Sequence, residues 1–172
     1  MSNFEPLVHI LSKRYMRKFL CKITLIGCLF ITTSAVAQEV IRQQACDVST
    51  IKNQIDSLKK LFARNNFALV REASMTMESD YEMPIIVPLT EGSLYQFVFI
   101  GDPTSRLYEV RMYDYEEKMV TYQKKMWGDI DGNIINYQYT PKFTEYHMIK
   151  PLQTNKQKKK VCGYVMLYKK VG

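Results

Sequence analysis

The sequence predicts a mainly β domain, an antiparallel β-sandwich or jelly roll of about eight strands with one N-terminal amphipathic helix. Three observations support this. From residue 67 onward, short apolar segments alternate with a period of two and are separated by turn residues. The 172-residue chain contains 12 Tyr and 8 Phe, which favour strands. Only one stretch has the helical period of 3.6. We therefore divide the chain into a signal peptide (1–37), an N-terminal segment with a helix (38–66) and a β-sandwich (67–172).

The first segment has the anatomy of a secretory signal peptide. Basic residues from Lys13 to Lys22 precede the apolar stretch Ile23–Ile31, and Ala35-Val36-Ala37 matches the small-x-small pattern before a peptidase cut. The apolar stretch is shorter than the ~20 residues that a membrane-spanning helix needs. The sequence thus predicts an exported protein, periplasmic or extracellular. Met16 would be a more ordinary start, which would place residues 1–15 upstream of the true start.

A lipid anchor is an alternative form of export. Leu25-Ile26-Gly27-Cys28 fits a lipoprotein box, whose processing would leave a lipidated Cys28. Only five residues separate Lys22 from Cys28, and the sequence after Cys28 stays apolar, so the peptidase cut after Ala37 is the preferred interpretation.

The charge of the chain does not favour a nucleic-acid partner. The formal net charge is +7, but residues 1–37 hold five basic residues against a single acid. The remainder has 19 basic and 16 acidic residues, a net charge of +3. Since most of the basicity belongs to a segment that export would remove, nucleic acid is not expected as a partner.

Two cysteines, Cys46 and Cys162, follow the signal segment. An exported chain meets an oxidising compartment, so this even pair predicts one disulfide between the segment before the helix and the last strand. Two buried free thiols are the alternative.

The predicted helix runs from Asp47 to Arg64. Its apolar residues recur at steps of three and four, and Leu61 widens this stripe. Asp47 or Ser49 would cap the N-terminus, and Asn65 and Asn66 would end the helix with a left-handed turn. We expect the stripe to pack on the sheet; its residues are Val48, Ile51, Ile55, Leu58 and Phe62.

The strands follow in order, each ended by turn residues. We expect Leu94–Ile100 to be covered on both faces, because both of its alternations are apolar. In the first strand the odd-numbered residues would share one face, and Ile85–Val87, between two prolines, suits a sheet edge. The predicted strands are Phe67–Met77, Ile85–Val87, Leu94–Ile100, Leu107–Asp114, Met119–Lys125, Ile134–Thr140, Glu145–Leu152 and Val161–Tyr168.

Three connections carry turn signals. A tight polar turn at Gly101–Thr104 joins the two strands that we expect at the centre of the sheet, within Leu94–Tyr115. Asp131-Gly132 favours a hairpin, and Thr154–Lys160 is expected to be an exposed hairpin loop.

The available chemistry does not favour an enzyme. The chain after residue 37 has one histidine, His147, and no nucleophile elbow or phosphate-binding glycine loop. A thiol dyad of Cys162 and His147 can be drawn, but the predicted disulfide would remove its nucleophile. No catalytic residue and no cofactor are predicted; a small hydrolase is the least favoured alternative.

A weak calcium-loop candidate lies between two predicted strands. Asp129, Asp131 and Asn133 place three oxygen ligands at alternate positions, as a calcium loop does. Glycine falls at the fourth position instead of the sixth, and Thr140 stands where a bidentate Glu is expected. A plain hairpin turn without metal is the preferred interpretation.

Aromatic residues near turns are the candidate binding residues. Tyr113, Tyr115 and Trp127, with Arg111, could stack on sugars or anchor a protein partner. A second candidate is the basic cluster of the exposed loop, which could meet an anionic surface or an acidic glycan but is more often only solvated; it comprises Lys156, Lys158, Lys159 and Lys160. The core is expected to hold Tyr108, Tyr122, Tyr137 and Tyr139.

The central run resembles two groups of proteins. Gln96-Phe97-Val98-Phe99, Met112-Tyr113-Asp114 and Cys162-Gly163-Tyr164 are similar to small exported β-sandwich proteins of unknown function from Bacteroidota, over about Ala45–Tyr168. In outline the run also resembles modules of the pre-peptidase C-terminal type. The resemblance implies an exported sandwich but no known activity. We expect a non-catalytic protein that binds a glycan or an envelope protein, with a structural or assembly component of the envelope as the alternative.

Overall fold

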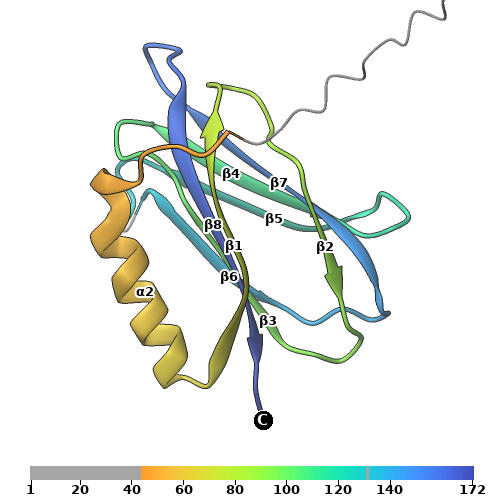
Figure 1. Cartoon of the computed structure of the whole chain (residues 1–172). Coiled ribbons are helices and arrows are strands. Elements are labelled where there is room, and N and C mark those ends of the chain that lie inside the picture. The colour runs from red at the N-terminus through yellow and green to blue at the C-terminus, as the bar shows by residue number, and fades with distance from the viewer. Residues whose placement is uncertain (1–43, 131) are drawn as a thin grey trace, which may run out of the picture. The chain divides into compact units, whose positions relative to one another are not determined.

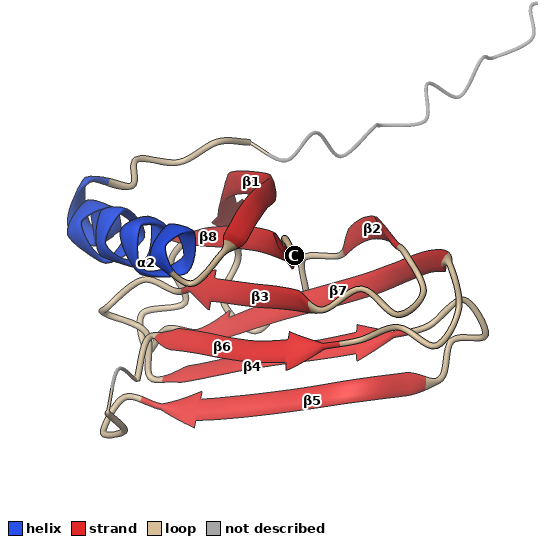
Figure 2. Cartoon of the chain, turned by 90° about the horizontal axis from the view of Figure 1, so that it is seen from below, coloured by secondary structure: helices blue, strands red, loops and turns tan. Residues whose placement is uncertain are grey.

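The structure, a computed structural model, describes residues 44–130 and 132–172. The predicted signal peptide and the Cys28 alternative lie outside these residues. Eight strands form two four-stranded sheets, and one short helix precedes them (Figures 1 and 2). The elements are η1 (Ser49–Ile51), α2 (Lys52–Arg64), β1 (Phe67–Met77), β2 (Ile85–Leu89), β3 (Tyr95–Ile100), β4 (Leu107–Tyr113), β5 (Met119–Met126), β6 (Ile134–Tyr139), β7 (Glu145–Thr154) and β8 (Val161–Lys170).

The two sheets have the strand order of a jelly roll. Sheet A is ordered β1-β8-β3-β6 and sheet B is ordered β2-β7-β4-β5. All the pairings are antiparallel. The chain changes sheet at every step except from β4 to β5, so most neighbours in a sheet are distant in sequence. The predicted antiparallel jelly roll is confirmed, and β2 lies at an edge of its sheet as its prolines indicated.

Three connections differ from the prediction. The segments around Asp131-Gly132 and Thr154–Lys160 are not hairpins, because β5 and β6, like β7 and β8, belong to different sheets. The turn at Gly101–Thr104 likewise carries the chain from β3 in sheet A to β4 in sheet B. Turn residues signal a reversal of the chain, but they do not determine whether the next strand pairs with the last one.

The inter-sheet core fills the space between the two sheets. It is formed by the side chains on the inner face of each sheet, and Phe99, Tyr108 and Val110 are fully buried in it. The Tyr108 hydroxyl donates hydrogen bonds to the carbonyl oxygens of Asp102 (2.7 Å) and Ser105 (2.8 Å). Burial, together with the nearby Asp102 carboxylate, raises the pKa of Tyr108 to about 12. The ring therefore fixes the β3–β4 turn while it fills the core.

The outer face of sheet A is covered by the helix. Ile51, Ile55 and Phe62 form a second apolar cluster with the sheet, and Figure 2 shows α2 beside β8, on the side away from β5. The sheet contributes to this cluster Phe67, Val98, Ile100, Tyr164, Met166 and Tyr168. β3 is consequently buried along its whole length, as its doubly apolar pattern predicted. No helix in the described ranges is long and apolar enough to cross a membrane.

The ends of the helix differ in how well the sequence predicted them. The α-helix begins at Lys52, after the 3-10 turn η1, and neither start has a side-chain cap. Asp47 instead accepts hydrogen bonds from the backbone N–H and hydroxyl of Ser49, both 2.9 Å, which lower its pKa. Leu61 is 48% exposed, so it does not belong to the buried stripe. The left-handed turn is confirmed at Asn66, whose φ is 58°.

A β-bulge divides β1 into two halves that face opposite ways. The pairing with β8 shifts between Leu69 and Arg71, so Val70 is the extra residue. Phe67 consequently packs under the helix, whereas Met75 and Met77 lie in the inter-sheet core. The prediction that the odd-numbered residues share one face is wrong, because one extra residue inverts the alternation.

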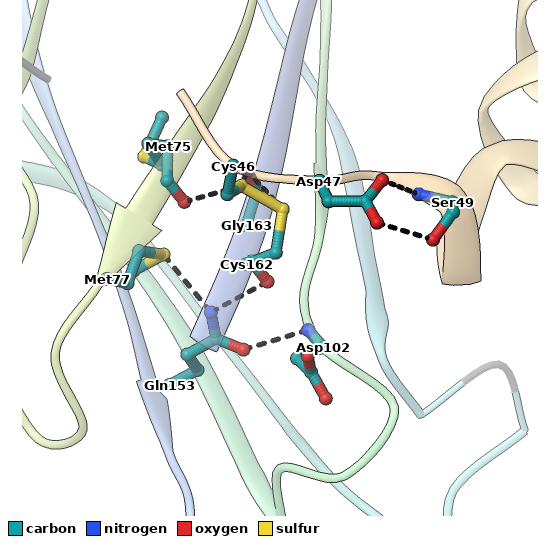
Figure 3. Close-up of a disulfide and its surroundings, with 9 residues drawn as sticks. All are labelled: Cys46, Asp47, Ser49, Met75, Met77, Asp102, Gln153, Cys162 and Gly163. Carbon is teal, nitrogen blue, oxygen red and sulfur yellow. Dashed lines mark hydrogen bonds between the residues drawn. A yellow bond between two sulfur atoms is a disulfide. The ribbon is translucent and has the colours of Figure 1, made fainter. Parts of the chain in front are cut away.

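The predicted disulfide is present between Cys46 and Cys162, with their Cα atoms 5.6 Å apart (Figure 3). It ties the segment before the helix to β8, and the backbone N–H of Thr76 donates to the Gln44 carbonyl oxygen at 2.8 Å. Below it lies the fully buried Gln153 of β7. Its amide accepts from the Asp102 N–H (2.9 Å) and donates to the Cys162 carbonyl oxygen (3.1 Å). Gln153 thus links the two sheets at this end of the sandwich.

Candidate functional site

The outer face of sheet B, here called the open face, is the first candidate site. Within the described residues no helix packs on it, and its side chains mix rings, aliphatic groups and charges. Among the exposed ones, Ile86 is 59% and Tyr146 is 60% accessible. Burial and strand register assign to this face Ile86, Pro88, Glu109, Arg111, Tyr113, Tyr122, Lys124, Tyr146, Met148, Lys150 and Leu152.

Arg111 lies at the centre of an ion network on the open face. Its Nη1 contacts Glu82 Oε1 at 2.7 Å and its Nη2 contacts Glu109 Oε2 at 2.8 Å. Lys150 contacts Glu82 at 3.4 Å, and Lys124 contacts Glu109 at 3.7 Å. Burial opposes the charge of Arg111, but Glu109 and Glu82 outweigh it and raise the pKa of its guanidinium. The network holds the guanidinium in one orientation on a rigid sheet.

Two tyrosine rings flank this network, Tyr113 on the same strand as Arg111 and Tyr122 on the neighbouring strand β5. The Lys150 Nζ lies 4.9 Å from the ring centroid of Tyr113, and the Arg111 Cζ lies 5.8 Å from that of Tyr122. Tyr122 is 44% exposed, so the prediction that it points into the core is wrong. The β4–β5 pairing shifts opposite Val120, and this irregularity inverts the alternation of β5 before Tyr122. Tyr108 and Tyr137 are core residues as predicted, and Tyr139 packs partly buried against the core.

The predicted binding residues do not form one patch. Arg111 and Tyr113 lie on the open face, and Tyr115 follows in the β4–β5 turn, 74% exposed. Trp127 lies at the other end of the same hairpin, where its backbone N–H donates to the Arg106 carbonyl oxygen at 2.9 Å. Since β4 has seven residues, about 20 Å separates these ends. The aromatic candidates therefore divide between two surfaces.

Trp127 belongs instead to a groove at one end of the sandwich, here called the basic groove. Its volume is about 550 Å³, and its walls come from the β3–β4 turn, the end of β5 and the β7–β8 loop. It is lined by four basic side chains, Arg106, Lys156, Lys159 and Lys160, beside Trp127. The sequence identified Trp127 and the lysines separately, but nothing local to either segment indicated that they meet.

Two of the three residues of the calcium-loop candidate make hydrogen bonds within the protein. Asp129 Oδ2 accepts from the Met126 N–H at 2.7 Å. The Asn133 amide exchanges two hydrogen bonds with Gln54 of α2, at 2.9 and 3.0 Å. Asp131 lies outside the described residues. In the part of the chain that the structure describes, no group of three or more His, Cys, Asp or Glu is placed to hold a metal ion.

His147 lies in the core rather than in a cleft. It is 1% exposed, and its Nε2 lies 3.1 Å from the Tyr139 hydroxyl and 3.6 Å from Glu145 Oε1. Cys162 is bonded to Cys46, so the thiol that a Cys–His dyad would need is already used. The one dyad that the sequence allowed is therefore not available in the oxidised protein.

Comparisons with known proteins give distant structural likenesses. No protein-family model matches the sequence, and no curated protein matches it significantly. A periplasmic inhibitor of g-type lysozyme from Aeromonas hydrophila is 11% identical, with a TM-score of 0.41 over 61% of this chain and 87% of that one. A CBM4 structure is 13% identical, with a TM-score of 0.34 over 58% and 73%. At these TM-scores the likenesses assign neither a family nor a ligand, and the resemblance to exported Bacteroidota proteins stays a prediction.

Proposed function

We propose that the protein is an exported, non-catalytic binding module that holds a saccharide on the open face of sheet B. The disulfide supports export, because such bonds persist in oxidising compartments. The observation that carries the proposal is the Arg111 network, held in place between tyrosine rings on a face that no described helix covers.

The chemistry of this face suits a sugar. A pyranose presents hydroxyls at its edge and a C–H surface on each side. Arg111, Glu109 and Glu82 supply donors and acceptors in fixed positions, while Tyr122 and Tyr146 supply exposed ring surface. Rigid sheet strands hold these groups, so little ordering is required when the ligand binds.

Isotope-labelled protein titrated with glucose, mannose and N-acetylglucosamine hexaoses tests the proposal by NMR. We expect shifts at Arg111, Tyr113 and Tyr122 with at least one probe. Tyr122→Ala should weaken binding about fivefold or more, since a lost ring contact is worth about 1 kcal/mol or more. Tyr81→Ala is the matched control, because Tyr81 is 68% exposed and lies outside the open face.

Two results would contradict the proposal. One is an absence of shifts on the open face with every probe while a crosslinker placed at Tyr146 captures an envelope protein. The other is an equal loss of affinity in Tyr122→Ala and Tyr81→Ala.

A further inference from the structure

The basic groove has the features of a second binding site, independent of the open face. Its four basic side chains come from two segments that are about 50 residues apart in sequence, Arg106 on one side and Lys156, Lys159 and Lys160 on the other. Asp102 is the one carboxylate among the lining residues. Its Oδ1 accepts from the Thr104 N–H (2.8 Å) and hydroxyl (2.6 Å). One carboxylate among four cations neutralises the groove only in part.

The basic side chains are largely free to meet a ligand. Within the described residues, Lys160 contacts Glu78 at 3.4 Å, and both side chains are more than half exposed. Arg106, Lys156 and Lys159 form no ion pair in the described part of the chain. Cations that are gathered in a hollow and left unpaired raise the local potential and attract anions.

The walls of the groove are held together by buried polar residues. Asn155 donates from Nδ2 to the Thr104 hydroxyl oxygen at 2.9 Å, and its Oδ1 accepts from the Gln157 N–H at 2.8 Å. The backbone N–H of Arg106 donates to the Thr154 carbonyl oxygen at 2.8 Å. Beneath them, Gln153 joins the Asp102 N–H to β8 (Figure 3). The β3–β4 turn and the β7–β8 loop are thus fixed to each other before any ligand arrives.

Trp127 indicates which kind of anion would suit the basic groove. Its side chain lies beside the cations and is 72% exposed. A simple inorganic anion gains nothing from an indole ring, whereas a sugar that bears an acidic substituent gains both a stacked ring and an ion pair.

We infer that the basic groove binds an acidic saccharide, whose sulfate, phosphate or carboxylate groups meet Arg106 and the lysines while a sugar ring stacks on Trp127. This site would operate whether or not the open face binds a saccharide. It assigns a role to the one tryptophan and to the loop lysines together.

The test measures the affinity of the oxidised mature protein for a sulfated hexasaccharide, an oligogalacturonate hexamer and an uncharged chitohexaose at several salt concentrations. We expect binding of at least one acidic probe that weakens as salt rises, whereas any binding of chitohexaose, which is also a probe of the open face, should not depend on salt. The triple variant Arg106→Gln, Lys156→Gln, Lys159→Gln should lose at least tenfold in affinity.

A matched variant controls for net charge. Lys52→Gln, Lys60→Gln, Arg64→Gln removes the same three charges from the exposed side of α2 and should change the affinity less than twofold. Trp127→Ala should weaken binding several-fold, and Trp127→Phe should restore most of the loss. Thermal melting checks that every variant is folded.

Four outcomes would overturn the inference. They are no binding of either acidic probe, an equal loss in the α2 control, an affinity that is unchanged in Trp127→Ala, and tighter binding to anionic phospholipid vesicles or to a thymidine oligonucleotide. Tighter binding to the vesicles would indicate a lipid-headgroup site, and tighter binding to the oligonucleotide would indicate a nucleic-acid site. Because the acidic probes and the groove variants report on the groove, their failure leaves the Tyr122 test of the open face unaffected.

Discussion

The outer faces of the two sheets differ, because a helix covers one of them and no described helix covers the other. On sheet A, α2 covers the outer face, so Val98 and Ile100 of β3 are buried there while Phe97 and Phe99 are buried on the other side. On sheet B the outer face carries Arg111, Glu109 and exposed rings. The difference teaches where binding should be sought. Residues on the covered face are constrained by packing, whereas residues on the open face are not needed for the core and can be used to bind a ligand.

The largest expected effect on stability comes from a substitution in the covered face. Phe62 of α2 is 5% exposed, and its ring lies 4.8 Å from that of Tyr168 and 6.0 Å from that of Phe67. Phe62→Ala should lower the free energy of unfolding by about 3–5 kcal/mol, measured by urea denaturation. Tyr146→Ala on the open face should change it by about 0.5 kcal/mol or less. Equal losses would mean that the two faces do not differ in this way.

The next effect concerns the covalent anchor of the covering segment. Replacing Cys46 and Cys162 together by Ala should cost about 2–5 kcal/mol, because the bond spans 116 residues and restricts the unfolded chain. Hydrogen exchange should show faster opening in α2 and β1 than in β4 and β5. A uniform increase over both sheets would show that the disulfide stabilises the whole sandwich rather than its covered side.

The smallest effect distinguishes a carboxylate that docks the helix from one that serves the open face. Glu72 of β1 accepts from Lys59 of α2 and from the Tyr164 hydroxyl, both at 2.5 Å. Burial works to raise its pKa, but these two contacts lower it overall. Since its side chain is 37% exposed, Glu72→Gln should cost only about 0.5 kcal/mol at pH 7.

The pH dependence of this cost has a definite sign. A lowered pKa in the folded state stabilises the protein above the unfolded value of 4.5, and this contribution is lost as pH falls through the folded value. The difference between wild type and Glu72→Gln should therefore be present at pH 7 and vanish in strong acid. Glu82→Gln, on the open-face network, should instead reduce saccharide affinity. A constant Glu72→Gln cost at every pH would contradict the assigned contacts.

Much of the local structure was predictable because it depends on neighbours in sequence. The helical stripe, the doubly apolar β3 and the period-two strands each reflect which faces are buried. The two bulges were not predictable. The extra residues at Val70 and Val120 look like any other strand residue, and each inverts the faces that follow. Gly101 was interpreted only as a turn residue, yet a Cβ there would collide with the Tyr108 ring.

The candidate sites show the same difference between features that depend on sequence neighbours and features that depend on distant segments. Arg111 and Tyr113 share one strand face, so their alternation with Val110 and Met112 predicted that they lie together. Trp127 and the lysines of the β7–β8 loop are separated by about 30 residues, and their own segments carry no signal of their meeting. Tyr122 was missed because its face depends on the irregular pairing of β5 with β4.

The sequence by itself determined the strands, the helix, the buried faces of the strands without a bulge, and the cysteine pair, because each depends on local periodicity or on composition. The tertiary structure alone decided which strands pair, and therefore that β3 and β4 separate into different sheets while β8 lies between β1 and β3. Strand pairing is a choice among distant partners of similar local pattern, which only the packing of the whole sandwich resolves. That same choice places Trp127 beside the loop lysines and leaves the face around Arg111 uncovered.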